Sequence, residues 1–508
     1  MVTSFCEITQ DEKQGRYLKT TQNVPEGSLI LKEEPLVIGP EGVGVVFCFC
    51  CNKILNGVKI PVCPKCKTAS VCNENCEGIW HSDNECDFFS KCSVQCGHFL
   101  VNSQIILPLR CLVFRNSNNQ KWDELLKLES HLEKRRKCPV WKDIAINIEA
   151  LFLNLGIISK VDVENELIQK ICGILDINSF ELRTNAFIDN YSSGPVHVLR
   201  GLYLKAALIN HDCVGNTHLA IDDNYNLIIH ASIDIPVGAS VYFNYSNPLK
   251  GNNERRLILR QSKYFDCLCN RCLDPSELKT EISSLRCPRC KHGFVRPVNV
   301  DGSYNMWSCN TCQRDFSHSL VQSTIIEARA LLNSLNISDI AEHEELLHKL
   351  LKTFSPNHFL LLEIKQNLIG LYTQSEPKVN KLRRKIELCE ELLPLFRVVE
   401  PGLSRMQGIT LYELQSARVL LAEKRVKNKE IDEKAFIEVL KDADSLLKQS
   451  IKHLLYEPKC SPEGRLCLEC LGELKRIRSL MTELELSPCC NEVKSHRKKD
   501  KTSCLSEL

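Results

Sequence analysis

The chain of 508 residues lacks long apolar runs and strong charge bias. No stretch approaches the roughly 18–20 apolar residues that a membrane-spanning helix needs, so we expect no membrane association. The first ten residues have neither a basic flank nor an apolar core, which argues against export. The net charge is only +2 without a long basic stripe, which argues against direct binding to duplex nucleic acid. The basic run from Lys494 to Lys501 could be a nuclear-targeting or nucleic-acid patch, but a solvated tail is the favoured interpretation.

Cysteine, in contrast, is abundant, with 29 residues. In a secreted protein this number would indicate disulfides, but without a leader we expect a cytoplasmic and/or nuclear location. In such a reducing compartment, paired cysteines are metal ligands before they are disulfides. Two thiolates separated by two residues can bind one tetrahedral Zn²⁺ without backbone strain. The spacing of the cysteines therefore becomes the main evidence.

The first group of cysteines offers eight ligands between residues 48 and 86. Their spacing is too tight for two independent fingers, so alternate pairs are expected to share a metal ion. One zinc site would use Cys48, Cys51, Cys72 and Cys76, and the other Cys63, Cys66, His81 and Cys86. Cys50 is a spare thiol beside the first site. The spacing resembles a MYND finger, although the final pair is one residue wider than usual.

Further cysteines follow in the second half of the chain. Cys267, Cys269 and Cys272 form one group, and Cys287, Cys290, Cys309 and Cys312 another. The latter has the spacing of a zinc ribbon, in which two hairpin knuckles bind one ion, with a turn at Gly302 between them. Two more pairs, Cys467 with Cys470 and Cys489 with Cys490, could form another metal site, but they are expected to lie on a helix and a tail, where buried or idle thiols are the favoured interpretation.

The segment Asn210-His-Asp-Cys-Val-Gly-Asn216 resembles the Asn-His-Ser-Cys-x-Pro-Asn motif of SET-domain lysine methyltransferases. A lone Asn-His pair would indicate little, because buried Asn and His usually make ordinary hydrogen bonds. Other segments that resemble the family follow its order: Gly15 to Leu18, Asn185 to Phe187, Arg200 to Tyr203, Gly238 to Tyr245 and Tyr264 to Cys272. A MYND finger inserted into a SET domain defines the SET and MYND domain-containing (SMYD) family. The segments Gly15 to Leu18, Glu34 to Pro40 and Pro401 to Arg405, with the zinc ribbon, are most similar to its arthropod-specific SmydA branch.

This resemblance and the hydrophobic pattern imply an α+β multidomain protein. Short strands are expected from residue 11 to 46 and again after 185, helices from 92 to about 180, and helices resembling tetratricopeptide repeats beyond 320, although no repeat of fixed period is found. We expect a SET N-terminal part (1–46), a MYND finger (47–90), a helical insertion (91–184), a SET core (185–250), a post-SET zinc region (251–284), a zinc ribbon (285–318), a C-terminal helical domain (319–490) and a basic, disordered tail (491–508).

The resemblance also implies a methyl transfer from S-adenosylmethionine to a protein lysine, with Tyr245 as the catalytic tyrosine. Gly15, Arg16, Tyr17 and Leu18 would form the cofactor loop, and Asn185, Asn210, His211 and Phe265 would bind the cofactor. Cys213 would join Cys267, Cys269 and Cys272 on a third zinc, giving about four structural zinc ions. Tyr203 would support the pocket wall.

Plainer interpretations stand beside these roles. Tyr242 and Tyr245 could serve in strand packing, and Asn185 and Phe187 could lie at a strand edge. Asp212 replaces the family's usual serine and Gly215 its usual proline, while Ala239-Ser240 replaces an acidic pair. These departures favour the alternative of an inactive scaffold that recruits proline-rich peptides through the MYND finger and helical domain. We favour the enzyme, acting as a monomer on histone or other nuclear or cytoplasmic proteins in transcriptional regulation.

Overall fold

The computed structural model describes residues 5–12, 14–41, 46–55, 60–73, 75–76, 80–182, 198–300, 303–459 and 461–486. The chain divides into two compact units, which are described separately. Unit 1 holds residues 1–210, 219–242 and 258–266, and unit 2 holds residues 211–218, 243–257 and 267–508. The division falls inside β7 (Asn210–His211), β8 (Thr217–Ile221), β10 (Tyr242–Phe243) and α11 (Asn252–Ser262).

The strands of unit 1 are short and antiparallel. The first sheet pairs β1 (Cys6–Asp11) with β2 (Gly15–Thr20). The second sheet has the strand order β3 (Leu29–Glu33), β9 (Leu227–Ala231) and β8. The third sheet has the strand order β4 (Val37–Glu41), β6 (Val198–Leu202) and β5 (Ser179–Leu182). Alternate residues of β9 are buried, as expected where one sheet face packs on a core. Gly15 follows the β1–β2 turn with a φ of 68°, a left-handed conformation that glycine adopts without steric cost.

The helices of unit 1 lie mainly between residues 80 and 178. They are α1 (Trp80–Asn84), α2 (Cys86–Lys91), α3 (Cys96–Val101), η1 (Ser103–Ile105), α4 (Ile106–Ser117), α5 (Asn119–Leu126), α6 (Leu132–Arg135), α7 (Pro139–Ile144), η2 (Ala145–Glu149), α8 (Ala150–Asn154), α9 (Lys160–Glu164), α10 (Leu167–Asn178) and η4 (Ala206–Leu208). The central helix α4 is buried from Ile106 to Phe114. It packs closely on β4, where a Cβ on Gly39 would lie 2.7 Å from Leu107 Cγ. The helical stretch expected between 92 and 180 is therefore confirmed.

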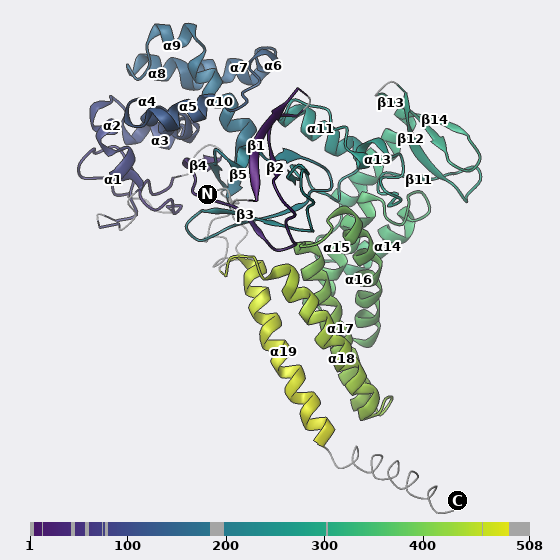
Figure 1. Cartoon of the computed structure of the whole chain (residues 1–508). Helices are drawn as coiled ribbons and strands as arrows, with labels where there is room; N and C mark the ends of the chain where they lie inside the picture. Colours follow the sequence, from purple (N-terminus) through teal and green to yellow (C-terminus); the bar gives the residue numbers. More distant parts are fainter. Residues whose placement is uncertain are drawn as a thin grey trace, which may run out of the picture. The chain divides into compact units, whose positions relative to one another are not determined.

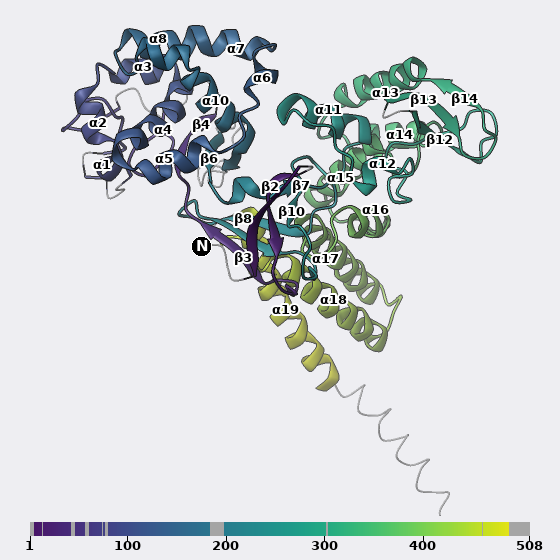
Figure 2. The same cartoon turned by 45° about the horizontal axis from the view of Figure 1, so that its top comes forward.

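A small sheet in unit 2 spans the segment that holds the zinc-ribbon cysteines. After α12 (Asn270–Leu273), its strands lie in the order β11 (Leu285–Arg286), β12 (Phe294–Val300), β13 (Ser303–Cys309) and β14 (Asp315–Ser317). Figure 2 shows this sheet at one end of α13 (His318–Asn333). The turn expected at Gly302 lies outside the described residues.

The remainder of unit 2 is helical, which confirms the helical C-terminal region. Its helices are α14 (Ile340–Leu350), α15 (Phe359–Gln374), α16 (Val379–Val399), α17 (Arg405–Lys427), α18 (Glu433–Leu454) and α19 (Pro462–Leu486). Short loops make consecutive helices antiparallel neighbours (Figure 1). Asp339, Ser404 and Asp432 begin three of them by accepting hydrogen bonds from backbone N–H groups of the first turn. No helix in the described part of the chain combines the length and apolarity needed to cross a membrane.

Candidate active site and metal centres

The structure gathers four groups of cysteine and histidine side chains, each with ligand atoms within 4.8 Å of one another. Unit 1 holds Cys48, Cys51, Cys72 and Cys76 in one group and Cys63, Cys66, His81 and Cys86 in another; unit 2 holds Cys213, Cys267, Cys269 and Cys272 in a third and Cys287, Cys290, Cys309 and Cys312 in a fourth. These are the four sets that the spacing and the family resemblance predicted. Cys50 stays outside its neighbouring group, as expected for a spare thiol.

The distances between sulfur atoms fit tetrahedral zinc. Paired Sγ atoms lie 3.8 Å apart for Cys48 and Cys76 and 3.7 Å apart for Cys287 and Cys312. Disulfide sulfurs would be about 2.05 Å apart. Four thiolates around Zn²⁺, with Zn–S bonds of about 2.3 Å, would have sulfur–sulfur edges of about 3.8 Å. Each group could therefore hold one zinc ion.

One backbone turn recurs at four Cys-x2-Cys pairs, two in the finger and two in the zinc ribbon. The residues that directly follow the pairs are Asn52, Lys67, Lys291 and Gln313, and all four have positive φ angles between 55° and 61°. The backbone N–H of each donates to the carbonyl oxygen of the first cysteine of its pair, at 2.8 to 3.0 Å. Cys467 and Cys470 instead lie buried in helix α19, as the sequence predicted.

A chain of buried polar contacts runs from a cysteine of the finger in unit 1 to helix α4. His81 directs Nε2 toward Cys66 Sγ at 3.3 Å, and its Nδ1 lies 3.5 Å from Glu85 Oε1. Arg110 donates to both carboxylate oxygens of Glu85, at 3.1 and 2.8 Å. It also donates to the carbonyl oxygen of Phe49, at 3.0 Å. All of these charged groups are buried, so a single arginine links the finger to α4.

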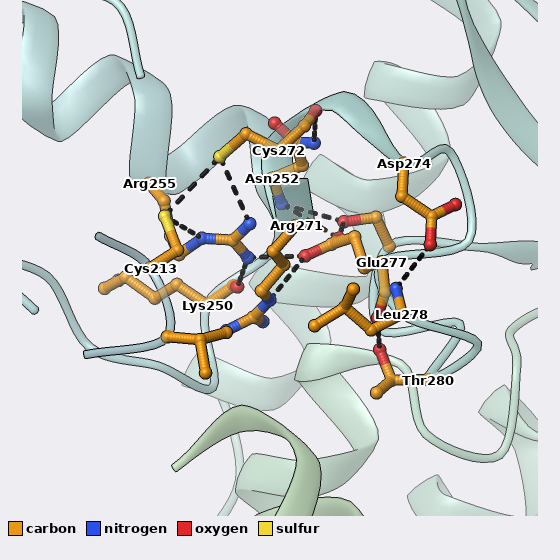
Figure 3. Close-up of polar contacts among 12 residues, drawn as sticks. Cys213, Lys250, Asn252, Arg255, Arg271, Cys272, Asp274, Glu277, Leu278 and Thr280 are labelled. Carbon is orange, nitrogen blue, oxygen red and sulfur yellow. Dashed lines mark hydrogen bonds and ion pairs between the residues drawn. The ribbon is translucent and has the colours of Figure 1, made fainter. Parts of the chain in front are cut away.

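The third cysteine group is assembled from two places in the sequence. Cys213 follows strand β7, whereas Cys272 lies in α12, and their sulfurs are 3.5 Å apart. Arg255, near the start of α11, donates from Nε to Cys213 Sγ at 3.4 Å and from Nη2 to Cys272 Sγ at 3.6 Å (Figure 3). Its Nη1 donates to Glu277 Oε2 at 2.6 Å. Arg255 therefore connects the sulfurs to a buried carboxylate.

Glu277 is the centre of this buried polar network. Arg271 also donates to Glu277 Oε2, at 3.2 Å (Figure 3). Ser283 donates to Glu277 Oε1. Burial opposes the charge of Glu277, but Arg255 and Arg271 hold the pKa of its carboxyl below the usual value. Nη1 and Nη2 of Arg271 are buried without hydrogen-bond partners. Arg255, which also donates to two of the sulfurs, favours ionised thiolates in the cysteine group, and ionised thiolates fit a bound metal ion.

His211 connects this group to the predicted catalytic residue. Its Nε2 lies 3.3 Å from Cys213 Sγ, and its Nδ1 accepts a hydrogen bond from the backbone N–H of Tyr245 at 3.0 Å. The two rings lie 5.2 Å apart. Desolvation lowers the pKa of His211 to about 4 and raises the pKa of the Tyr245 phenol above its usual range. Both side chains are therefore neutral near pH 7.

The other predicted cofactor residues of known placement belong to unit 1. Asn210 Nδ2 donates to the carbonyl oxygen of Gln14 at 3.1 Å, and the Tyr242 hydroxyl donates to Gln14 Oε1 at 3.3 Å. The loop that leads into Gly15 is thus held from two sides. Arg16 donates to the carbonyl oxygen of Lys127 at 2.5 Å.

The remaining predicted residues have diverse surroundings. Leu18 is buried in β2, and Tyr17 and Phe265 are partly buried. The buried Tyr203 donates from its hydroxyl to the carbonyl oxygen of Tyr225 at 2.6 Å. Asn185 and Phe187 lie outside the described residues.

Asp212, which replaces the family's usual serine, stabilises its own turn. Its Oδ1 accepts a hydrogen bond from the backbone N–H of Val214 at 2.8 Å. Desolvation raises the pKa of this carboxyl to about 6, and the negative charge of Cys269 acts in the same direction. The substitution therefore has a structural role in the loop that carries Cys213.

Sequence reasoning missed Gln14, Arg255, Arg271 and Glu277. Arg255 belongs to the run Glu254-Arg-Arg256 near the start of an amphipathic helix, where charged residues usually face solvent. Its burial depends on a partner 22 residues away, which no local pattern indicates.

Comparisons with known proteins give relatives but no family model that matches. The SET domain-containing protein SmydA-8 (isoform A) of Drosophila melanogaster is 24% identical over 420 residues, covering 80% of this chain and 87% of that protein. The human histone-lysine N-methyltransferase SMYD3 is 24% identical over 274 residues, covering 51% of this chain and 59% of SMYD3.

Among solved structures, the SET domain of LSMT bound to lysine and AdoHcy aligns with 13% identity and a TM-score of 0.26, covering 100% of this chain and 93% of that one. At this TM-score the likeness carries no argument. The sequence relatives and the gathered cysteine groups together confirm what the motifs indicated: the chain is related to the SET and MYND domain-containing family.

Proposed function

We propose that this protein is an S-adenosylmethionine-dependent protein-lysine N-methyltransferase. The observation that carries the proposal is the arrangement of the Asn-His motif, in which Cys213 joins a metal-binding group and His211 holds the backbone of Tyr245. Relatives named as histone-lysine N-methyltransferases support the reaction class. The choice of substrate, whether histone or another nuclear or cytoplasmic protein, and a role in transcription are parts of the same proposal.

The residues around the cofactor loop fit a bound nucleoside. A Cβ on Gly15 would meet nothing within 4 Å, so the backbone of this loop is open on that side. Asn210 and Tyr242 fix Gln14 and thereby the approach to the loop. S-adenosylmethionine, when bound, supplies a methyl group activated by a positively charged sulfonium. The protein then contributes mainly alignment and the exclusion of water.

Tyr245 would orient the lysine amine. Because desolvation keeps its phenol protonated near pH 7, it can donate or accept a hydrogen bond but cannot act as the base. The lysine must arrive neutral, which a desolvated site favours because it disfavours the charged amine. Tyr245 therefore positions the amine and does not accept its proton. Removing its hydroxyl should lower the turnover rate more than the affinity for the cofactor.

Calorimetry with S-adenosylmethionine tests the first step. We expect the wild-type protein to bind and Asn210→Ala to bind at least about 10-fold more weakly, because the loop at Gln14 loses a fixed partner. Absence of binding to the wild type, with zinc present, would contradict the proposed enzyme.

Methyl transfer to a panel of proteins tests the second step. Tyr245→Phe should lower kcat by about 100-fold or more, which is typical for one positioned hydrogen-bonding group. Tyr412→Phe in α17 is the matched control and should keep normal activity. Equal activity in both variants would show that Tyr245 is not catalytic.

A binding scaffold is the second candidate function. Asp212 and Gly215, which replace the usual serine and proline of the motif, favour it. A scaffold would bind proline-rich peptides through its MYND finger yet show no affinity for S-adenosylmethionine. The calorimetry above separates the two functions.

A further inference from the structure

The hydrogen bonds of His211 define its protonation state. The backbone N–H of Tyr245 points at Nδ1 at 3.0 Å, so this nitrogen is the acceptor and carries no proton. In a neutral ring the proton must then reside on Nε2, which lies 3.3 Å from Cys213 Sγ. The imidazole therefore donates to a sulfur on one side and accepts from the backbone of Tyr245 on the other.

Arg255 is a second donor to the same sulfur. Its Nε lies 3.4 Å from Cys213 Sγ, and its Nη2 lies 3.6 Å from Cys272 Sγ. Because its Nη1 is held by Glu277 and by the Lys250 carbonyl oxygen, the guanidinium has one fixed orientation. The side chain is fully buried, so solvent does not compete for these bonds.

Two N–H donors that meet one sulfur suit a metal-bound thiolate. Four thiolates around Zn²⁺ leave a net charge of −2, and N–H donors that spread this charge orient the ligands and tune the site. A neutral thiol accepts hydrogen bonds far more weakly. The positions of His211 and Arg255 thus complement the metal-loaded state of the third cysteine group.

We propose that Arg255 and His211 are positioning residues that join this zinc site to Tyr245. Arg255 fixes the sulfur of Cys213, the sulfur fixes the imidazole of His211, and the imidazole fixes the backbone at Tyr245. The inference rests on the proposed methyltransferase function only for its effect on turnover. The link between metal and histidine stands on geometry within unit 2 alone.

Two variants of His211 separate the contact of its ring with Cys213 from the contact with the backbone of Tyr245. The amide of Asn reaches about as far as Nδ1, so His211→Asn can keep the bond to Tyr245 and lose the donor to Cys213. The amide of Gln reaches about as far as Nε2, so His211→Gln can keep the donor to sulfur and lose the bond to Tyr245. We expect His211→Asn to release zinc faster to a chelator, while His211→Gln releases it at nearly the wild-type rate. Both should lower kcat, by up to about 100-fold, because a misplaced tyrosine no longer aligns the amine.

Substitutions of Arg255 test its role in metal binding, and a substitution of Arg271 is the control. Arg255→Met should weaken metal binding at this site by about 10-fold to 100-fold, the usual effect of losing a group that hydrogen-bonds a metal ligand. Arg271→Met removes an equally buried arginine whose Nε also donates to Glu277, but whose Nη1 and Nη2 make no hydrogen bond in the described structure. It should leave the metal affinity of the third site near the wild-type value. Arg255→Lys keeps the charge but not the forked contact, and should restore metal binding only in part.

Nuclear magnetic resonance gives the readout that does not depend on activity. In protein with nitrogen-15 histidine and cadmium-113 in place of zinc, we expect His211 as the Nε2–H tautomer and one cadmium resonance that shifts in Arg255→Met but not in Arg271→Met. An Nδ1–H tautomer, or equal cadmium spectra for the two arginine variants, would overturn the proposal. If these signals are as expected but no methyl transfer is found, the proposed function fails while the metal–histidine link stands.

Discussion

Buried arginines accompany the metal centres of both units. Arg110 forms a buried ion pair with Glu85, which contacts His81 of the finger in unit 1. Arg255 forms a buried ion pair with Glu277 and also donates to a sulfur of the third cysteine group. All four side chains are at most 2% exposed. Transferring such charges from water is costly, and removing one partner of a buried pair leaves the other uncompensated. Each arginine therefore ties the conformation around the metal to a distant segment of its unit.

Replacing one member of such a pair should be strongly destabilising. Arg110→Met removes the bonds to Glu85 and the cation–π contacts with Phe47 and Phe49. We expect a loss of about 3–5 kcal/mol in the free energy of unfolding of unit 1. Urea unfolding measures it. The double variant Arg110→Met with Glu85→Leu should recover part of this loss, and no recovery would show that the charge pairing is not the cause.

The contribution of Asp162 to the free energy of unfolding should depend on pH. Arg115 donates to its carboxylate at 2.8 Å and, with the Ser159 cap, lowers the pKa of Asp162 to about 2. A carboxyl whose folded pKa is below its unfolded value of 3.8 stabilises the protein above about pH 4 and loses that contribution as pH falls toward 2. Asp162→Asn should cost about 2 kcal/mol at pH 7 and at pH 5, and less at pH 3.

Urea titrations of the wild type and Asp162→Asn at these three pH values measure the difference. Arg115→Met provides the control, because Asp162→Asn should then cost much less in that background. A difference between wild type and variant that stays constant down to pH 3 would contradict the depressed pKa.

Among the elements, the zinc knuckles were predictable because their geometry is local. Each of the four Cys-x2-Cys pairs of the finger and the ribbon builds its own turn, with a left-handed residue directly after the second cysteine. The same spacing at Cys467 and Cys470 folds into helix α19, where the surrounding helical periodicity prevails. The contacts of Arg255 and of the His211 ring depend on tertiary packing, which no sequence window contains. The boundaries between the domains stay a prediction.

Helix α10 owes its position to a glycine. A Cβ on Gly173 would lie 2.5 Å from the carbonyl oxygen of Ser130, so the helix can pack there only without a side chain. Although alanine favours helices, Gly173→Ala should destabilise unit 1 by about 1–3 kcal/mol through overpacking. Gly472→Ala in α19, where a Cβ meets nothing within 4 Å, should stabilise its helix by about 0.5–1 kcal/mol. Thermal unfolding measures the change in Tm of each variant. Changes of the same sign in both variants would contradict the packing argument.

For the molecule as a whole, each unit carries two cysteine groups, so folding of both should depend on metal. Structural zinc contributes directly to folding because the ligands are not assembled in the unfolded chain. We expect metal analysis to find close to four zinc ions per chain, one for each group.

Cys51→Ser should lose one ion, while Cys50→Ser, one residue away but outside the group, should keep all of them. Cys467→Ser should also keep them, because that thiol lies in a helix. Two ions or fewer in the wild type would contradict the assignment. Loss of an ion in Cys50→Ser would show that the first group uses the neighbouring thiol.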